Sequence, residues 1–418
     1  MFSVARNRLS SSILLPFVRR MMSKVPCIPV RIDEQSIPTG AKEVLRIVRP
    51  QWTSINGESN IKSKVFTDGL SNKLVGFFVD ENKEDVVIVK VFGTNTDVMI
   101  DRKAEIETMR LLHERKCGAE VYATFDNGIC YQYMNGVTLE VDDCQDPEIF
   151  PLVAAEMAKM HSDIGKGQHQ NLKVSQSNKS HLENAHLVSV NGTKCASNGV
   201  EKNHSQNGED QNKSQIWNKL RQINKLGEEI LMSDPEFRKK LENVGVVPGW
   251  ASDAINELES ILESQDMPVT FCHNDLIPRN IVYDEDKEKI TFIDVEYAMY
   301  NYAAFDVANH FLEFAGIDQI DYSKCPNVAF RHEWIKEYLK NLKLEHYAEE
   351  ITVEKYDLWV QFCTPASHLF WGVWGIYQAK HSTIDFDYIG YVGLRFSEYR
   401  KLIDNLRNLS SIRDDKSA

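Results

Sequence analysis

A single stretch, residues 271–313, constrains the fold and the chemistry of this 418-residue chain more than any other part of it. Its two halves, 271–283 and 290–297, are flanked by apolar and β-branched residues, so each half is predicted to be a short buried strand. The charged run between them is typical of a hairpin turn. Polar groups at strand ends beside such a turn usually face a cleft. The stretch is therefore expected to bring four side chains together: Asp275, Asn280, Asp294 and Glu296.

Three of these four side chains are carboxylates, and all four offer oxygen atoms. The carboxylates of Asp275, Asp294 and Glu296 repel one another unless a cation neutralises them, and oxygen ligands without a paired Cys or His suit Mg²⁺. The spacing Asp275-x-x-x-x-Asn280, with a second Asp on a following strand, is the layout of a kinase catalytic loop. In that layout Asp275 accepts the proton of a substrate hydroxyl, while Asn280 and Asp294 hold the metal. The alternative is a solvated hairpin in which these residues only cap turns.

The motif extends well beyond these residues. It reads His273-Asn-Asp275-x-x-x-x-Asn280, then Ile293-Asp294-Val-Glu296-Tyr297-Ala-x-Tyr300-Asn301-Tyr302-x-x-Phe305-Asp306-x-x-Asn309-His310-Phe311-x-Glu313. Over about residues 67–395 the chain resembles the choline/ethanolamine kinase family, and the variants at 300–305 and 313–316 are most like its ethanolamine kinase branch. The resemblance implies an α+β, protein-kinase-like fold with two lobes. A small β-rich nucleotide-binding lobe is expected at residues 36–134, and a large, mostly helical catalytic and substrate lobe at 135–418.

Length and charge agree with a two-lobed soluble enzyme. A chain of 418 residues is too long for one simple core, and the formal net charge of −13 argues against a nucleic-acid surface. Residues 1–35 form a basic leader that is expected to be disordered. Its composition is also that of a mitochondrial presequence, although the resemblance implies a cytoplasmic protein. Residues 165–213, rich in Asn, Ser, Gln and Lys, are predicted to be a disordered insertion. No stable membrane insertion is expected.

The N-terminal lobe carries the residues expected to bind ATP. The strand predicted at 85–92 is apolar apart from Lys90, and a charge in such a run needs a partner. Glu105 and Glu107, on a helix predicted at 102–114, are both candidates, and the match to the family favours Glu105. The alternative is a Lys90 that points outward from a strand edge. The resemblance also assigns to the nucleotide a phosphate-covering turn and the hinge between the lobes, with Thr67, Ser71, Asn72, Gln132 and Met134.

A pair of tryptophans marks the expected substrate end. Trp371 and Trp374 are three residues apart on a helix predicted at 365–379, which follows another helix predicted at 352–364. Two tryptophans at helical spacing are more often core residues than ligands. The resemblance changes that balance, because family members line their amine pocket with this Trp-Gly-x-Trp pair and with tyrosines that match Tyr297 and Tyr391.

The choice of amine depends on the residues that follow the motif. A trimethylammonium group needs aromatic faces around it, whereas a primary ammonium has three N–H donors and needs oxygen acceptors. Choline kinases carry an additional aromatic residue a few positions beyond the residue that matches Glu313, and this chain has Asp318 there. We therefore expect Glu313 or Asp318 to hold a primary ammonium, and ethanolamine to be preferred.

These observations lead to one expected activity. The chain is predicted to phosphorylate ethanolamine with ATP and Mg²⁺, giving phosphoethanolamine, the first step of phosphatidylethanolamine synthesis by the nucleotide-activated route. Glu296 is expected to support a second ion or the substrate, and His273 to hold the catalytic loop through Asp294 or the region of Asp306. Choline kinase, and a catalytically silent pseudokinase that binds amines, remain alternatives. The sequence leaves open whether the protein is a monomer or a homodimer.

Overall fold

The computed structural model describes most of the chain: residues 25–54, 60–66, 72–79, 85–93, 96–163, 213–317, 319–344, 351–382 and 384–417. Residues 1–24 of the predicted leader and 165–212 of the predicted insertion lie outside the described residues, as do Thr67, Ser71 and Asp318. Among the described residues, no helix combines the length and the apolar character needed to cross a bilayer.

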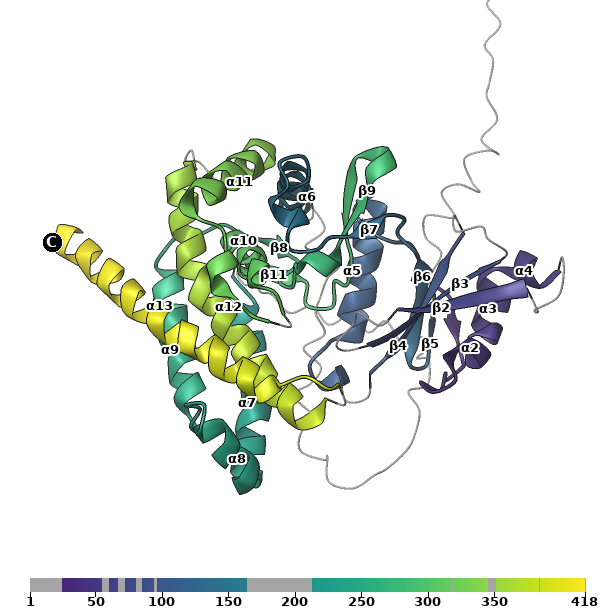
Figure 1. The fold of residues 1–418 in the computed structure, drawn as a ribbon, viewed down its shortest axis with the longest axis horizontal. Helices are drawn as coiled ribbons and strands as arrows, with labels where there is room; N and C mark the ends of the chain where they lie inside the picture. The colour runs from purple at the N-terminus through teal and green to yellow at the C-terminus, as the bar shows by residue number, and fades with distance from the viewer. Residues whose placement is uncertain are drawn as a thin grey trace, which may run out of the picture.

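A six-stranded sheet forms the centre of the N-terminal lobe. Its strand order is β1-β5-β6-β4-β3-β2; β1 runs parallel to β5 and every other neighbouring pair is antiparallel. Figure 1 shows α2, α3 and α4 beyond this sheet, away from the rest of the molecule, and α5 on the side that faces it. The elements are β1 (Cys27–Ile28), α2 (Ile37–Gly40), α3 (Lys42–Val48), α4 (Pro50–Ser54), β2 (Ile61–Phe66), β3 (Asn72–Val79), β4 (Val87–Phe92), α5 (Arg102–Glu114), β5 (Val121–Phe125) and β6 (Gly128–Gln132).

Helix α5 occupies the span that its sequence predicts, because its start is strongly specified. The Asp101 side chain accepts hydrogen bonds from the backbone N–H groups of Lys103 and Ala104 and so caps the helix. Leu111 and Leu112 then bury their side chains in the main hydrophobic core, while Glu105 turns inward toward the sheet. The helix thereby places an acidic side chain against the middle of β4.

The C-terminal lobe is mostly helical and carries two small sheets, one with the order β10-β9-β7 and one that pairs β11 with β8. Helix α10 is buried along its whole length and packs against α12. The elements are β7 (Val137–Thr138), α6 (Phe150–Asp163), α7 (Ile216–Ser233), α8 (Pro235–Glu242), α9 (Trp250–Glu263), β8 (Val269–Cys272), β9 (Ile281–Asp284), β10 (Lys289–Phe292), β11 (Met299–Tyr302), α10 (Ala303–Leu312), α11 (Val328–Asn341), α12 (Val353–His381) and α13 (Tyr388–Ser417). The predicted protein-kinase-like architecture of two lobes is confirmed.

Two local predictions were wrong. The helices expected at 352–364 and 365–379 are one continuous helix, α12, with Pro365 inside it. Proline removes one backbone donor and usually ends or kinks a helix, but most of α12 is buried, so packing on both sides of Pro365 maintains the helix. The stretch 271–283 was expected to be one strand. It contains β8 and β9, which belong to different sheets, and the loop between them carries the polar motif.

Candidate active site

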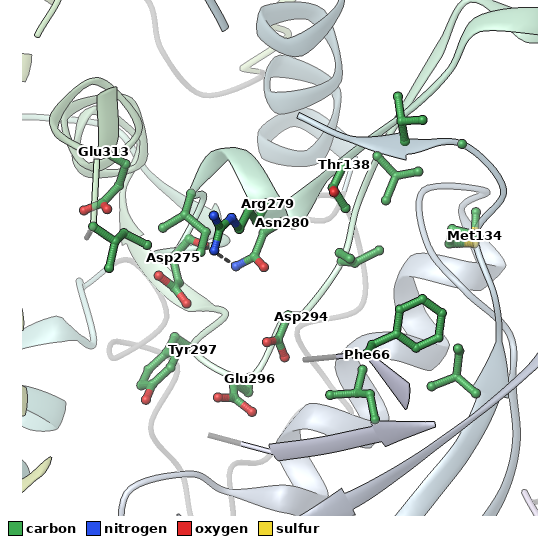
Figure 2. A pocket seen from close by; sticks show the side chains of 18 of the residues that line it. Phe66, Met134, Thr138, Asp275, Arg279, Asn280, Asp294, Glu296, Tyr297 and Glu313 are labelled. Carbon is green, nitrogen blue, oxygen red and sulfur yellow. Dashed lines mark hydrogen bonds between the residues drawn. The ribbon is translucent and has the colours of Figure 1, made fainter. Parts of the chain in front are cut away.

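A cavity of about 490 Å³ lies between the two lobes and collects most of the predicted site residues. Figure 2 shows Asp275, Asn280, Asp294 and Glu296 directed into it from the loops beside β8, β9 and β10. Gln132 and Met134 line one end, near Phe66 and Thr138. Tyr297, Glu313, Trp371, Trp374 and Tyr391 line the other end. The backbone of Asn72 begins β3, but the Asn72 side chain is not among the parts of the chain that the structure describes.

A fully buried carboxylate, Asp306 on α10, holds the loop that carries Asp275. It accepts hydrogen bonds from the backbone N–H groups of His273 at 2.6 Å and Asn274 at 2.5 Å, and it contacts Nε2 of His161 at 3.0 Å. Asn274 has φ +66°, a left-handed conformation that costs free energy in an L-residue and so needs such support. Asp275, the next residue, is thereby directed toward the cavity.

The strand β10 delivers the second acidic group. The His273 ring contacts the carbonyl of Ile293 at 2.9 Å and so joins the two halves of the motif. Asp294 follows with φ +59°, another left-handed residue, and its side chain is 32% exposed within the cavity. Asn280 donates a hydrogen bond from Nδ2 to the backbone carbonyl of Asp275 at 2.8 Å. The amide oxygen of Asn280, Oδ1, takes no part in this hydrogen bond. His273 therefore acts as the structural hydrogen-bonder that the sequence predicts: its backbone N–H bonds Asp306, one of the two expected partners, while its ring contacts the carbonyl of Ile293 and not Asp294.

Lys90 on β4 is buried and contacts three carboxylates. Its Nζ lies 2.8 Å from Glu105, 2.8 Å from Asp294 and 3.1 Å from Glu296. Burial alone would lower the pKa of Lys90, but the three carboxylates outweigh it and raise the pKa well above its ordinary value. The expected pair with Glu105 is present, and the outward-pointing alternative is wrong. Glu107 instead pairs with Arg110 on an exposed face.

Glu296 contacts two cations, Lys90 and Arg102. The same oxygen that faces Lys90 also lies 3.2 Å from Nη1 of Arg102, which in turn bonds Glu105 at 2.8 Å. The Glu296 side chain is only 2% exposed. Arg102 thus completes a network of two cations and three carboxylates, and sequence reasoning missed it because residues 102 and 296 lie far apart in the chain.

The carboxylates facing the cavity are crowded. Burial raises the pKa of Asp294 to about 6, and repulsion from Glu296 adds to the effect while Lys90 opposes it. Burial also raises the pKa of Asp275 well above its ordinary value, with Asp294 as the next cause. Carboxyl groups of this kind bind protons or a cation readily. Oxygens of Glu105, Asp294 and Glu296 lie within 4.8 Å of one another, and the Lys90 ammonium contacts all three carboxylates.

The end of the cavity near β6 suits a flat apolar group. Phe66, Leu74 and Ile88 from the sheet face Val282 and Ile293 from the C-terminal lobe. Gly136 leads the chain out of this region with φ +134°, and a Cβ there would lie 2.4 Å from the carbonyl oxygen of Tyr283, so glycine is required. Such a slot, with backbone at its edge, can hold a nucleotide base.

The opposite end is walled by aromatic rings that are fixed by their own polar atoms. Trp374 donates from Nε1 to the Tyr297 hydroxyl at 2.7 Å, and Trp371 donates from Nε1 to Oδ1 of Asn309 at 2.8 Å. The Tyr297 and Trp371 rings lie 5.3 Å apart in an edge-to-face arrangement. Both tryptophans are almost fully buried, and both also line the cavity. They are therefore core residues and pocket residues at the same time.

Close packing of α12 on α13 positions this wall. A Cβ at Gly372 would lie 2.2 Å from the Phe396 ring, and one at Gly375 would lie 2.7 Å from Val392. Gly372, within the Trp-Gly-x-Trp motif, and Gly375, which follows it directly, therefore let α13 approach α12 and bring Tyr391 to the cavity. Arg395, one turn further along α13, also lines the cavity and pairs with Glu313 at 2.7 Å. Sequence reasoning did not identify Arg395.

Two lobes with a cavity between them, a buried lysine–glutamate pair and acidic loops at the cavity define the class of protein-kinase-like phosphotransferases. Comparison with known proteins narrows the class. The family model described as choline/ethanolamine kinase matches residues 63–400. The chain belongs to the choline/ethanolamine kinase family.

Individual relatives agree with this assignment. Ethanolamine kinase 2 of Rattus norvegicus is 34% identical over 379 residues, which cover 90% of this chain and 84% of the relative. The ethanolamine kinase of Drosophila melanogaster is 32% identical, over 94% of this chain and 82% of the relative. Among solved structures, an ethanolamine kinase of Plasmodium vivax matches with a TM-score of 0.67 at 23% identity, covering 95% of this chain and 96% of that chain. The structural likeness supports the fold.

Proposed function

We propose that this protein transfers the γ-phosphoryl group of ATP to the hydroxyl of ethanolamine. The observation that carries the proposal is the position of Asp275 in the cavity between the lobes. On one side of it lie the base-sized apolar slot and the Lys90 network, and on the other the aromatic wall with Glu313. The relatives named ethanolamine kinase support the choice of substrate.

The chemistry follows from the groups along the cavity. The substrate hydroxyl oxygen forms the new bond to the γ-phosphorus, the bond to the β,γ-bridging oxygen breaks, and Asp275 accepts the hydroxyl proton. Burial raises the pKa of Asp275, so in its ionised form this carboxylate is a stronger base than an exposed one. Lys90, held by Glu105, is placed to neutralise phosphate oxygens. Gln132 and Met134 offer backbone groups to the edge of the base.

The charge balance of the site fits a divalent cation. When ionised, the carboxylates of Glu105, Asp275, Asp294 and Glu296 exceed the cations Lys90 and Arg102 by two charges. The available donors are oxygens, the ligands that Mg²⁺ prefers. Asp294 and Asn280 would hold the ion, with Glu296 in support. The ion would supply charge neutralisation for the nucleotide phosphates.

The end of the cavity with the aromatic wall, where the phosphoryl acceptor would bind (the acceptor end), favours a small amine. The faces of Trp371, Trp374 and Tyr297 can surround a cation, and Glu313 adds an oxygen acceptor for N–H groups. Choline is the second candidate, because the same aromatic faces would accept a trimethylammonium group. Asp318 stays a predicted contributor to the preference for ethanolamine.

A kinase assay with purified protein tests the proposal. ADP release is measured with ethanolamine, choline and no amine, for the wild type, for Asp275→Asn and for Asp284→Asn. Asp284 is a matched control because it ends β9, the strand that follows the Asp275 loop, but pairs with Lys287 and does not line the cavity. We expect ethanolamine-dependent turnover in the wild type and the control, and a loss of about 10²–10⁴-fold in Asp275→Asn. A wild type that turns over none of the amines contradicts the proposal and favours the pseudokinase.

A further inference from the structure

The ion pair between Arg395 and Glu313 is the feature of the acceptor end that the proposed reaction leaves unexplained. Both side chains are about 95% buried, both line the cavity, and they come from segments 82 residues apart in the chain. Arg395 Nη2 donates to Oε1 of Glu313 at 2.7 Å, and its Nε donates to the Tyr391 hydroxyl at 3.0 Å. One guanidinium group therefore fixes two walls of the pocket.

A guanidinium in a pocket for a cation carries two costs. It repels the substrate, and its Nη1 is buried without a hydrogen-bond partner among the described residues. Leaving a buried donor unpaired destabilises the folded protein. An apolar side chain at position 395 could fill the same space without either cost. We therefore expect Arg395 to have a function in the pocket itself.

The pair changes what the pocket can recognise. With Arg395 bound, Glu313 contributes little net charge, and one of its oxygens, Oε1, is already occupied. What remains is a carboxylate oxygen in a fixed position, which accepts a hydrogen bond from an N–H group but gives little attraction to a cation that lacks one. The tryptophans do not depend on Arg395, because Asn309 and Tyr297 hold them.

We infer that Arg395 is a positioning residue that sets amine selectivity, by holding Glu313 as an oriented acceptor for the N–H groups of the substrate. The inference rests on the proposed function and deepens it. A primary ammonium gains from the oriented oxygen, whereas a trimethylammonium group contacts only the aromatic faces. Removing Arg395 leaves Glu313 as a mobile, uncompensated carboxylate. The resulting loss of kcat/KM should be larger for amines that carry more N–H groups.

The test uses a graded series of acceptors: ethanolamine, its N-methyl and N,N-dimethyl derivatives, and choline. kcat and KM are measured for the wild type, Arg395→Met, Arg395→Lys and Arg400→Met. Arg400 is the matched control; it lies on the same helix, stacks over Trp250 and bonds the carbonyl of Gly245, away from the cavity. The wild type should lose kcat/KM along the series as N–H groups are replaced.

In Arg395→Met the dependence on N–H number should flatten, and the ratio of kcat/KM for ethanolamine to that for choline should fall at least about tenfold, mainly through KM for ethanolamine. Arg395→Lys, which keeps the charge without the fork, should fall in between and serves where the methionine variant is unstable. Arg400→Met should keep the wild-type ratio.

A double-mutant cycle with Glu313→Gln separates positioning from packing. If Arg395 acts through Glu313, its effect on the ratio should largely vanish in the Glu313→Gln background. Unchanged selectivity in a folded Arg395 variant, or additive effects in the cycle, would overturn the inference while leaving the kinase activity in place. A wild type without ethanolamine turnover would instead refute the proposed function.

Discussion

Replacing Asp306 by asparagine should cost both stability and catalysis, and the two losses can be separated. Asp306 is fully buried and accepts three contacts, from the backbone of His273 and Asn274 and from His161. Burial favours its neutral form, but the His161 hydrogen bond, the electrostatic influence of the two histidines and the backbone donor outweigh burial and keep the pKa of Asp306 below its ordinary value. The native carboxyl is thus ionised, and its hydrogen bonds are charge-assisted.

The magnitude follows from the lost bonds. An asparagine oxygen in the position of Oδ2 keeps the contacts with His273 and His161, but the bond from Asn274 is lost and the remaining contacts are no longer charge-assisted. Hydrogen bonds to a charged group contribute about 1.5–3 kcal/mol each and neutral ones about 0.5–1.5 kcal/mol, so one lost and two weakened bonds give a loss of about 3–6 kcal/mol. Without its anchor Asn274 is free to leave φ +66°, and Asp275 moves with it. A displacement of about 1 Å in a reacting group lowers kcat about 100-fold.

The matched control is Asp357→Asn, a second buried carboxylate that does not line the cavity. Asp357 accepts two bonds from Arg331, at 2.7 and 3.0 Å, and one from Gln361 at 2.9 Å. Both variants should show a lower midpoint in urea unfolding. At a temperature well below both transitions, kcat should fall about 100-fold for Asp306→Asn and less than about threefold for Asp357→Asn. Equal kcat values in the two variants would refute the anchoring role.

Two further predictions concern stability. His310 is buried against Trp334, and burial lowers its pKa to about 4; its unfolded value lies near 6.5, so its stabilising effect is complete above that pH and is lost as the pH falls toward 4, by about 2 kcal/mol at pH 5. Urea unfolding at pH 7.5 and pH 5 should show this drop, and a His310→Gln variant that drops equally would contradict it. Gly372→Ala forces a Cβ to within 2.2 Å of the Phe396 ring and should destabilise by about 1–3 kcal/mol, whereas Gly227→Ala, with 3.3 Å to Ile376, should be tolerated. Thermal unfolding measures both, and equal midpoints for the two alanine variants would argue against close packing of α12 on α13.

Local signals made much of the fold predictable. The Asp101 cap and the periodic apolar residues define α5, and the charged turn between β9 and β10 defines their hairpin. The fold class was predictable as well, because the motif from His273 to Glu313 is long and specific. The lobe boundary at residue 134 and the roles of the site residues stay predictions.

Features that depend on contacts between distant parts of the chain could not be predicted from local sequence signals. Pro365 predicts a helix end by every local rule, yet α12 continues because its surroundings bury it on both sides. Arg102 and Arg395 pair with glutamates 194 and 82 residues away, and each of these arginines looks like an ordinary helix residue in the sequence. The isolated charge at Lys90 was a usable signal because a cation within an apolar strand requires partners wherever they come from.

The two ends of the cavity solve opposite electrostatic problems. At the Lys90 network the carboxylates outnumber the cations, which would repel a triphosphate; on the proposed function that end therefore binds the nucleotide well only together with a divalent cation. At the acceptor end Arg395 balances Glu313, so net charge attracts a cationic substrate only weakly. On the proposed function, selectivity there comes from directional hydrogen bonds and aromatic faces, which distinguish amines by their N–H groups, whereas charge alone would bind every small cation alike.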